Sequence, residues 1–257
     1  MDYINAKKSL GQHFLKDRNI AQKIVGCLQM EKYSAVLEIG PGMGILTGFL
    51  MERNGIELKV IEIDPESVNY LRMHFPGLGS SIVEGDFLTT DFRFLFDKPF
   101  LIIGNFPYNI SSQIFFKILG IRNRVPQVVG MIQKEVAERI ASKHGSKNYG
   151  ILSVILQAFY DIEYLFTVNE NVFFPPPKVK SAVIRLKRNQ VEKLPCSDDF
   201  FVTVVKTAFN QRRKMMRNSL KSICGEIPEI YADKRPEQLS VADFIELTRL
   251  IENLIKK

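Results

Sequence analysis

Residues 36–44 read Val36-Leu37-Glu38-Ile39-Gly40-Pro41-Gly42-Met43-Gly44, an apolar run followed by three glycines at alternate positions. The run is typical of a buried strand, and the glycines let the backbone turn tightly and approach a ligand without side-chain interference. The spacing is not the Gly-x-Gly-x-x-Gly of dinucleotide-binding loops, because position 45 is Ile45, and no Gly-Lys-Ser/Thr follows as in a phosphate-binding loop. We therefore expect a nucleoside ligand without a pyrophosphate.

Further apolar runs alternate with helical patterns along the chain. The expected strands after this one are Leu58 to Ile63, Ile82-Val83, Phe100 to Ile103 and Val128 to Ile132. Such runs, separated by helices, are typical of a parallel sheet covered on both faces, so we expect an α/β fold. Two later runs, Tyr160 to Val168 and Ser181 to Leu186, are joined by a proline-containing loop, which predicts an antiparallel pair at one sheet edge.

The composition changes near Arg188, where a polar linker leads into helical periodicity. We expect residues 1–187 to form the α/β domain, with a basic arm at its start, and residues 188–257 to form a small all-helical domain. The length of 257 residues fits this division.

The chain is basic, with a net charge of +7, which suggests a polyanionic partner. The segment from Lys206 to Lys221 contains six basic residues and no acidic one. On a helix, Arg213, Arg217 and Lys221 would form one basic stripe. Such a run is often only a solvated face, but it can also track nucleic-acid phosphates.

Several classes of protein are disfavoured. The three cysteines and three histidines are too scattered for a disulfide framework or a metal site. No long apolar segment predicts a membrane span, and the first residues lack the apolar stretch of a signal peptide. We expect a cytoplasmic monomer that needs no metal.

Carboxylates follow the second and third expected strands. Glu62 can accept hydrogen bonds from both ribose hydroxyls, whereas Asp64 precedes Pro65 and is typical of a helix cap. Asp86 can accept from an adenine amine, with Phe87 against the ring. Together with the glycine loop, this layout is typical of an S-adenosylmethionine site.

The fourth expected strand ends at Asn105-Phe106-Pro107-Tyr108. The Asn105 carboxamide oxygen can accept from an exocyclic amine, and Pro107 favours an extended Phe106 whose carbonyl lies in the same plane. Tyr108 can stack on the ring. A simple strand-to-helix turn is the alternative explanation.

The chain resembles the bacterial small-subunit rRNA adenine dimethyltransferase family of the KsgA type. The resemblance runs from Ser9 to Leu186. The matching segments are residues 9–15 (Ser-Leu-Gly-Gln-His-Phe-Leu), 38–42 (Glu-Ile-Gly-Pro-Gly), 105–111 (Asn-Phe-Pro-Tyr-Asn-Ile-Ser), 133–136, 149–154 and 173–179 (Phe-Phe-Pro-Pro-Pro-Lys-Val). Phe106 and His13 depart from common family residues, but neither change removes the expected contact.

The resemblance implies a Rossmann-like class I methyltransferase sheet with a C-terminal RNA-binding helical domain. The implied reaction is dimethylation of the exocyclic amines of two adjacent adenosines in a hairpin loop near the 3′ end of 16S rRNA. S-adenosyl-L-methionine is the implied cofactor, and an assembly intermediate of the small ribosomal subunit is the implied partner.

The resemblance, together with the residue patterns, gives a set of expected site residues. The expected cofactor contacts are His13, Leu15, Gly40, Gly42, Glu62, Asp86, Phe87 and Asn105. The expected catalytic residues are Asn105, Phe106, Pro107 and Tyr108, with Phe173 stacking on the other face of the target base. The expected RNA contacts are Arg212, Arg213, Arg217, Lys221 and Lys178.

Two alternatives remain at this point. One is the related methyltransferase that modifies an adenine of large-subunit rRNA and confers macrolide resistance. The other is a non-catalytic RNA-binding or assembly relative, which the intact Gly40, Glu62, Asp86, Asn105 and Tyr108 disfavour.

Overall fold

The computed structural model describes residues 4–256. Residues 1–3, which belong to the segment that we expect not to be a signal peptide, and Lys257 lie outside the described part. The chain divides into two compact units, one of residues 1–137 and 163–188, the other of residues 138–162 and 189–257. The helical unit therefore includes residues 138–162 in addition to the segment after Arg188.

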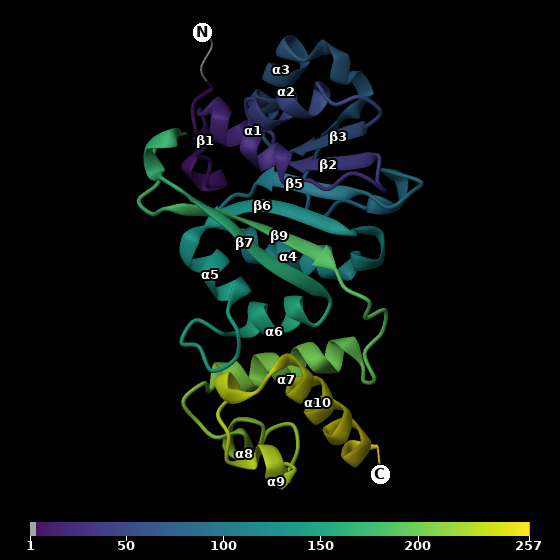
Figure 1. Cartoon of the computed structure of the whole chain (residues 1–257), viewed down its shortest axis with the longest axis vertical. Coiled ribbons are helices and arrows are strands. Elements are labelled where there is room, and N and C mark those ends of the chain that lie inside the picture. The colour runs from purple at the N-terminus through teal and green to yellow at the C-terminus, as the bar shows by residue number, and fades with distance from the viewer. Residues whose placement is uncertain (1–3, 257) are drawn as a thin grey trace. The chain divides into compact units, whose positions relative to one another are not determined.

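Within residues 4–256, a seven-stranded sheet has the order β4-β3-β2-β5-β6-β9-β7 (Figure 1). Its strands are β2 (Ala35–Ile39), β3 (Glu57–Glu62), β4 (Ile82–Glu84), β5 (Leu101–Asn105), β6 (Gln127–Gln133), β7 (Tyr160–Val168) and β9 (Ser181–Arg188). Neighbouring strands from β4 to β6 are parallel, and β9 runs antiparallel to β6. This confirms the expected α/β fold with a mostly parallel sheet.

Helices cover the sheet because its strands are apolar on both sides. One face packs Val36, Val60 and Ile103 against α1 (Arg18–Gly26), α2 (Ile45–Met51) and α3 (Pro65–His74). The alternate residues Leu37 and Ile102 are equally buried, as a sheet covered on both faces requires. The remaining helices of the α/β part are α4 (Ser111–Gly120) and α5 (Lys134–Ala141), with 3-10 turns at Lys8–Leu10, Pro76–Ser81, Phe92–Phe94, Arg122–Arg124 and Glu170–Val172.

The chain can pack closely at the end of β5 because Gly104 and Gly130 have no Cβ atom. A Cβ at Gly104 would lie 2.5 Å from the Ile39 carbonyl oxygen, and one at Gly130 would lie 2.7 Å from the Phe106 ring. The Phe106 side chain fills this space, is fully buried and meets Phe115 edge-on at 5.9 Å. The carboxyl ends of β2 and β5 are therefore held in close, fixed contact.

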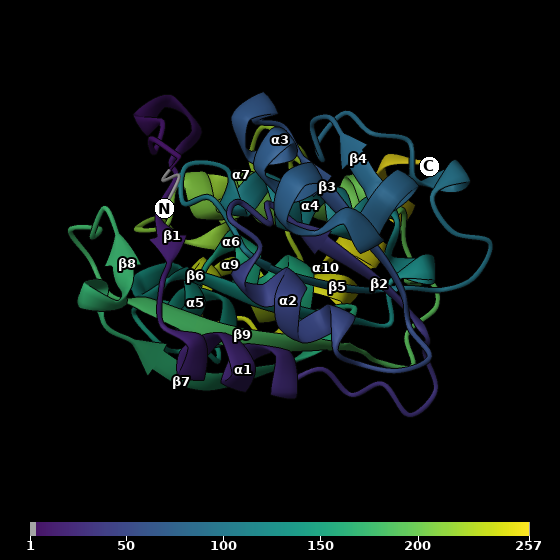
Figure 2. The same cartoon turned by 90° about the horizontal axis from the view of Figure 1, so that it is seen from above.

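A second, two-stranded sheet joins the N-terminal arm, meaning the described residues 4–17 before α1, to the proline-containing loop. It pairs β1 (Phe14–Leu15) antiparallel with β8 (Phe173–Phe174), so that Phe14 faces Phe174 and Leu15 faces Phe173 in register. Figure 2 shows β1 beside β8. Lys16 continues the pairing through its N–H, which donates to the Val172 carbonyl.

The second unit is helical. Its elements are α6 (Ile151–Gln157), α7 (Asp198–Asn210), α8 (Met216–Ser219), α9 (Glu229–Ala232), a 3-10 turn at Pro236–Gln238 and α10 (Val241–Ile255). Phe201 and Phe244 are fully buried between these helices. No helix within residues 4–256 has the length and apolar character to cross a membrane.

The expected basic helix through residue 221 is wrong. Helix α7 ends at Asn210, a turn follows, and α8 has only four residues. A continuous helix would place like charges every fourth residue, which is unfavourable, and the Met216 N–H instead donates to the Lys234 carbonyl. Arg213, Arg217 and Lys221 therefore do not form one helical stripe.

Candidate active site

A cavity of about 270 Å³ lies at the carboxyl ends of the parallel strands, entirely in the first unit. Its lining comes from the arm and from four strand ends: residues 9–15, 38–43, 45–46, 61–63, 85–88 and 105–110. Ligands of open α/β sheets bind at this edge. The expected cofactor residues, from His13 to Asn105, thus line one cavity.

The glycine loop takes backbone conformations that favour glycine. Gly40 and Gly42 have φ of 65° and 55°, in the left-handed region. A Cβ at Gly42 would also lie 2.8 Å from the Phe14 ring of the arm. Both glycines are therefore needed for the loop to turn beneath the arm.

Glu62 is a buried carboxylate at the end of β3. Its two oxygens accept hydrogen bonds from the N–H groups of Gly42, at 3.1 Å, and Asp64, at 2.9 Å. Burial raises the pKa of Glu62, and the two N–H groups oppose that rise. Each oxygen keeps a further lone pair for a ligand hydroxyl.

Asp86 and Phe87 follow β4. One Asp86 oxygen accepts from the Leu88 N–H at 2.8 Å, which orients the carboxylate. Phe87 is only 4% exposed and packs on Phe92 with ring centroids 4.9 Å apart, so its ring is part of the cavity wall. Leu15 is similarly buried and contributes to the core as well as to the lining.

Asn105 is oriented by the arm. Its Nδ2 donates to the His13 carbonyl at 2.8 Å, which leaves Oδ1 as the acceptor of the carboxamide. The next residue, Phe106, donates its N–H to the Met131 carbonyl at 3.0 Å. The side-chain and main-chain acceptors of this pair are therefore held by the arm and by β6.

Tyr108 lies between the arm and β9. Its hydroxyl is hydrogen-bonded to the Ser181 Oγ, and its ring stacks on His13 with centroids 5.4 Å apart. His13 Nδ1 in turn contacts the Pro175 carbonyl at 2.8 Å. Burial raises the pKa of Tyr108, so the phenol stays neutral at ordinary pH.

The structure does not place Phe173 where a base can stack on it. Pairing of β8 with β1 turns its side chain into the core, where it is 1% exposed. Phe174 points the other way, because successive strand residues alternate, and is 49% exposed. Phe174 is therefore the aromatic of this pair that can meet a ligand.

Glu38, at the end of β2, was not among the expected site residues. It is 1% exposed, lines the cavity and accepts a hydrogen bond from the Thr47 hydroxyl at 2.6 Å. Burial raises the pKa of Glu38 to about 8. Its position just before the glycine loop in the sequence is the signal by which Glu38 could have been predicted as a site residue.

The charge of the lining selects among ligands. Among the described lining residues are the carboxyl groups of Glu38, Glu62 and Asp86 but no lysine or arginine. A phosphate would be repelled here, whereas a cation or a set of hydroxyl and amine donors would be stabilised. Within residues 4–256, no three His, Cys, Asp or Glu side chains are grouped as metal ligands.

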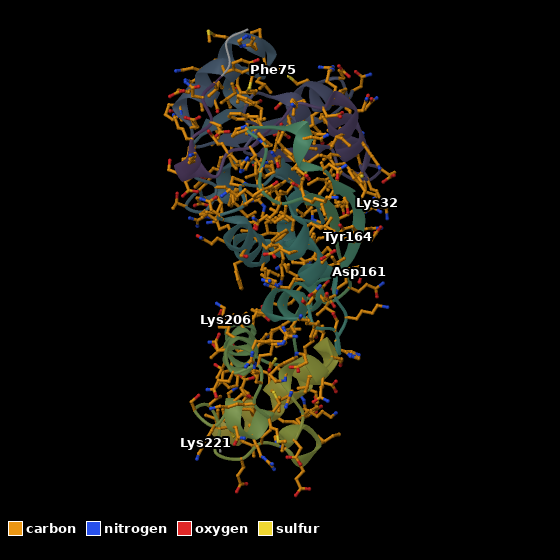
Figure 3. All side chains as sticks on the ribbon, turned by 90° about the vertical axis from the view of Figure 1, so that its left-hand side faces the viewer. Lys32, Phe75, Asp161, Tyr164, Lys206 and Lys221 are labelled. Carbon is orange, nitrogen blue, oxygen red and sulfur yellow. The ribbon has the colours of Figure 1, made fainter. Side chains whose placement is uncertain are left out.

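The expected RNA contacts are distributed over both units. Lys178 is exposed in the first unit, whereas Arg212 and Arg213 line a hollow of the second unit with Lys147 and Arg235. Arg217 forms an ion pair with Asp233 at 2.6 Å. Figure 3 shows Lys206 and Lys221 at the outer surface of the second unit.

The comparisons with known proteins point to one family. The family model described as Ribosomal RNA adenine dimethylase matches residues 3–252. The Ribosomal RNA small subunit methyltransferase A of Parabacteroides distasonis is 56% identical over 261 residues, covering 100% of this chain and 98% of that protein. The protein of the same name from Flavobacterium johnsoniae is 57% identical over 256 residues, covering 98% of each chain.

Two solved structures of methyltransferases have a similar fold. A dimethyladenosine transferase from Plasmodium falciparum superposes with a TM-score of 0.78 at 26% identity, covering 95% of this chain and 98% of that one. The 23S rRNA methyltransferase ErmE has a TM-score of 0.67 at 26% identity, covering 91% and 99%.

The raised pKa of Glu38 predicts a pH dependence of stability. A carboxyl group whose pKa is higher in the folded state stabilises the fold below its unfolded pKa, and that stabilisation is lost as pH rises towards about 8. Glu38→Gln removes the titration. Between about pH 5 and about pH 8, the free energy of unfolding of the variant should therefore rise by about 2 kcal/mol or more relative to that of wild type. Urea unfolding at each pH measures this difference.

The matched control is Glu52→Gln, which changes an exposed carboxylate at the end of α2 in the same unit. Its difference from wild type should stay constant over this range. Parallel curves for Glu38→Gln and wild type would show that Glu38 is ionised throughout.

Proposed function

Because the chain belongs to the ribosomal RNA adenine dimethylase family, we propose that it dimethylates two adjacent adenosines near the 3′ end of 16S rRNA. The observation that carries this proposal is the Asn105 carboxamide, held with its acceptor oxygen available at the end of β5 in a cavity suited to S-adenosyl-L-methionine. It is an S-adenosylmethionine-dependent enzyme of small-subunit biogenesis.

The cavity residues fit this cofactor. Glu62 would bind the ribose hydroxyls, Asp86 the adenine amine, and Phe87 would form the wall beside the ring. Gly40 and Gly42 would let the backbone approach the ligand closely, and the arm at His13 and Leu15 would cover it. The lining carboxylates suit the positive charge of the ligand, and the absence of lysine and arginine from the described lining suits its lack of phosphate. When bound, the cofactor supplies a methyl group on a positively charged sulfur.

Asn105 and Phe106 act on the amine of the target adenine. That nitrogen is a poor nucleophile because its lone pair is delocalised into the ring. Its two hydrogens would donate to Asn105 Oδ1 and to the Phe106 carbonyl, which localises the lone pair on nitrogen. Both acceptors are held in place before substrate arrives, so little reorganisation is needed.

Tyr108 holds the base and does not act as a general base. The adenine must leave its stack to reach the cavity, and aromatic platforms offset that cost by roughly 1–3 kcal/mol each. His13 covers one face of Tyr108, which leaves the other for the base. The neutral phenol hydrogen-bonds to Ser181 and has no role in proton removal.

Phe174 would provide the second aromatic surface. It is joined to the site through its neighbour Pro175, whose carbonyl contacts His13. Lys178 of the first unit and the basic hollow at Arg212 and Arg213 of the second unit would bind RNA phosphates, which position the RNA without reading its sequence. We further propose that Arg217 and Lys221 extend this surface, so that residues 1–187 form the catalytic part and 188–257 the RNA-binding part. The enzyme would be a cytoplasmic monomer whose substrate is an assembly intermediate of the small subunit.

The direct test is methyl transfer from labelled S-adenosylmethionine to small ribosomal subunits that lack the modification. The expected product is labelled dimethyladenosine near the 3′ end of 16S rRNA, identified by nuclease digestion and mass spectrometry. Transfer to large-subunit RNA alone would favour the macrolide-resistance type of reaction. No transfer, with cofactor and RNA both bound, would favour a non-catalytic role.

Asn105→Ala tests the catalytic carboxamide. Removing the acceptor should lower kcat by about a hundredfold or more, as for loss of a transition-state hydrogen bond, while cofactor Kd changes by less than about fivefold. Single-turnover transfer and calorimetric titration measure the two effects. The control Asn54→Ala, in an exposed turn, should behave as wild type. Equal losses of rate and cofactor affinity would mean that Asn105 mainly holds the cofactor.

Phe174→Ala and Phe173→Ala form a matched pair. Phe174→Ala should raise KM for RNA by roughly five- to a hundredfold while changing the free energy of unfolding by less than about 0.5 kcal/mol. Phe173→Ala should instead lower that free energy by about 3–5 kcal/mol, because its ring is buried. Steady-state kinetics and urea unfolding of both variants measure these effects. An unchanged KM for Phe174→Ala would show that Phe174 does not contact the RNA.

A further inference from the structure

Asp64 is a fully buried carboxylate that the chemistry above does not use. Part of its bonding is local, because it caps α3 by accepting from the Glu66 N–H at 3.3 Å and the Ser67 hydroxyl at 3.0 Å. The rest comes from the N-terminal arm. Lys7 Nζ lies 2.6 Å from Oδ1, and Gln12 Nε2 donates to Oδ2 at 3.0 Å.

The arm residues are also joined to each other. Gln12 Oε1 accepts from the Lys7 N–H at 2.8 Å, and Gly11 turns the chain between them with φ of 64°. Burial alone would raise the pKa of Asp64, but hydrogen bonds from Lys7, Gln12 and Ser67 outweigh it and hold that pKa below its usual range. The Asp64 carboxylate is therefore charged while the arm is in place. This one side chain contacts both Lys7 and Gln12, which lie at the two ends of the turn.

The same arm orients the catalytic carboxamide. His13 follows Gln12 directly, and its carbonyl accepts from Asn105 Nδ2. Adjacent Cα atoms are about 3.8 Å apart, so the contact of Gln12 with Asp64 limits where the His13 carbonyl can lie. A chain of contacts thus runs from Asp64, just after β3, through Gln12 and His13 of the arm to Asn105 at the end of β5.

We propose that Asp64 is a positioning residue for methyl transfer, which acts through Lys7, Gln12 and the His13 carbonyl to orient Asn105. The inference rests on the function proposed above. The clasp, meaning Asp64 with Lys7 and Gln12, also holds residues 9–15 over the cofactor cavity. Weakening it therefore slows the chemical step and speeds cofactor dissociation together.

The test compares variants that keep the helix cap. Asp64→Asn retains a good capping residue but removes the charge of one of the two carboxylates that Lys7 contacts, the other being Glu66 at 2.9 Å. Lys7→Met removes the cation from a partly exposed side chain, and Lys7→Arg restores it. With saturating cofactor and unmodified small subunits, single-turnover transfer should fall about tenfold in Asp64→Asn and in Lys7→Met. Lys7→Arg should be near wild type.

Two further readouts separate positioning from general stability. The double variant Lys7→Met with Asp64→Asn should lose less than the two single losses combined, because both changes break the Lys7–Asp64 contact, whereas only Lys7→Met also removes the contact with Glu66. Trypsin should cleave the arm after Lys8 or Lys16 several times faster in either single variant, while the rest of the chain stays resistant. Asp91→Asn, which breaks an exposed ion pair with Arg93 elsewhere in the same unit, is the control and should change neither readout.

Wild-type transfer rates for Asp64→Asn and Lys7→Met, or fully additive losses in the double variant, would overturn the proposal. Absence of transfer by the wild-type protein would count against the proposed function instead. In that case the trypsin comparison still decides the clasp, since equal arm cleavage in all variants would show that Asp64 does not hold it.

Discussion

The contact between the ends of β2 and β5 is the constraint on which the site depends. The Ile39 carbonyl approaches Gly104 so closely that no Cβ fits between them. Ile39 leads directly into the glycine loop, and Gly104 leads directly into Asn105. The glycine loop and the Asn105 carboxamide are therefore placed by one backbone contact, and the buried Phe106 ring fixes the direction in which the chain leaves the sheet.

Electrostatics divide the molecule by task. The cavity gathers three carboxyl groups with no lysine or arginine among its described lining residues, whereas basic side chains line the hollow of the second unit. Burial raises the pKa of Glu62, and it raises the pKa of Glu38 to about 8, so that near neutral pH Glu38 adds little negative charge to the empty cavity. A cationic ligand lowers these pKa values on binding and thereby strengthens its own site.

Much of the site followed from the order of residues along the chain. Parallel strands bring their carboxyl ends to one edge, so Gly40, Glu62, Asp86 and Asn105 were predictable as neighbours. The orientation of Phe173 was not, because it depends on pairing between two strands far apart in sequence, and a shift of one residue exchanges the buried and exposed rings. The break after Asn210 was also missed, since helical periodicity does not register like-charge repulsion or the bond from Met216 to Lys234.

The arm explains how these parts can work as one site. Its carbonyl at His13 holds the amide of Asn105, its residues 9–15 line the cavity, and its β1 strand pairs with the loop that carries Phe174. An enzyme that methylates one nitrogen twice must exchange its cofactor between transfers, so the cover over the cavity has to open. If the same segment orients Asn105, the acceptor oxygen that we propose acts in catalysis is fully placed only while the cavity is closed. A clasp of hydrogen bonds to one carboxylate is suited to this use, because each bond is individually weak enough to break, whereas together they set a single closed geometry.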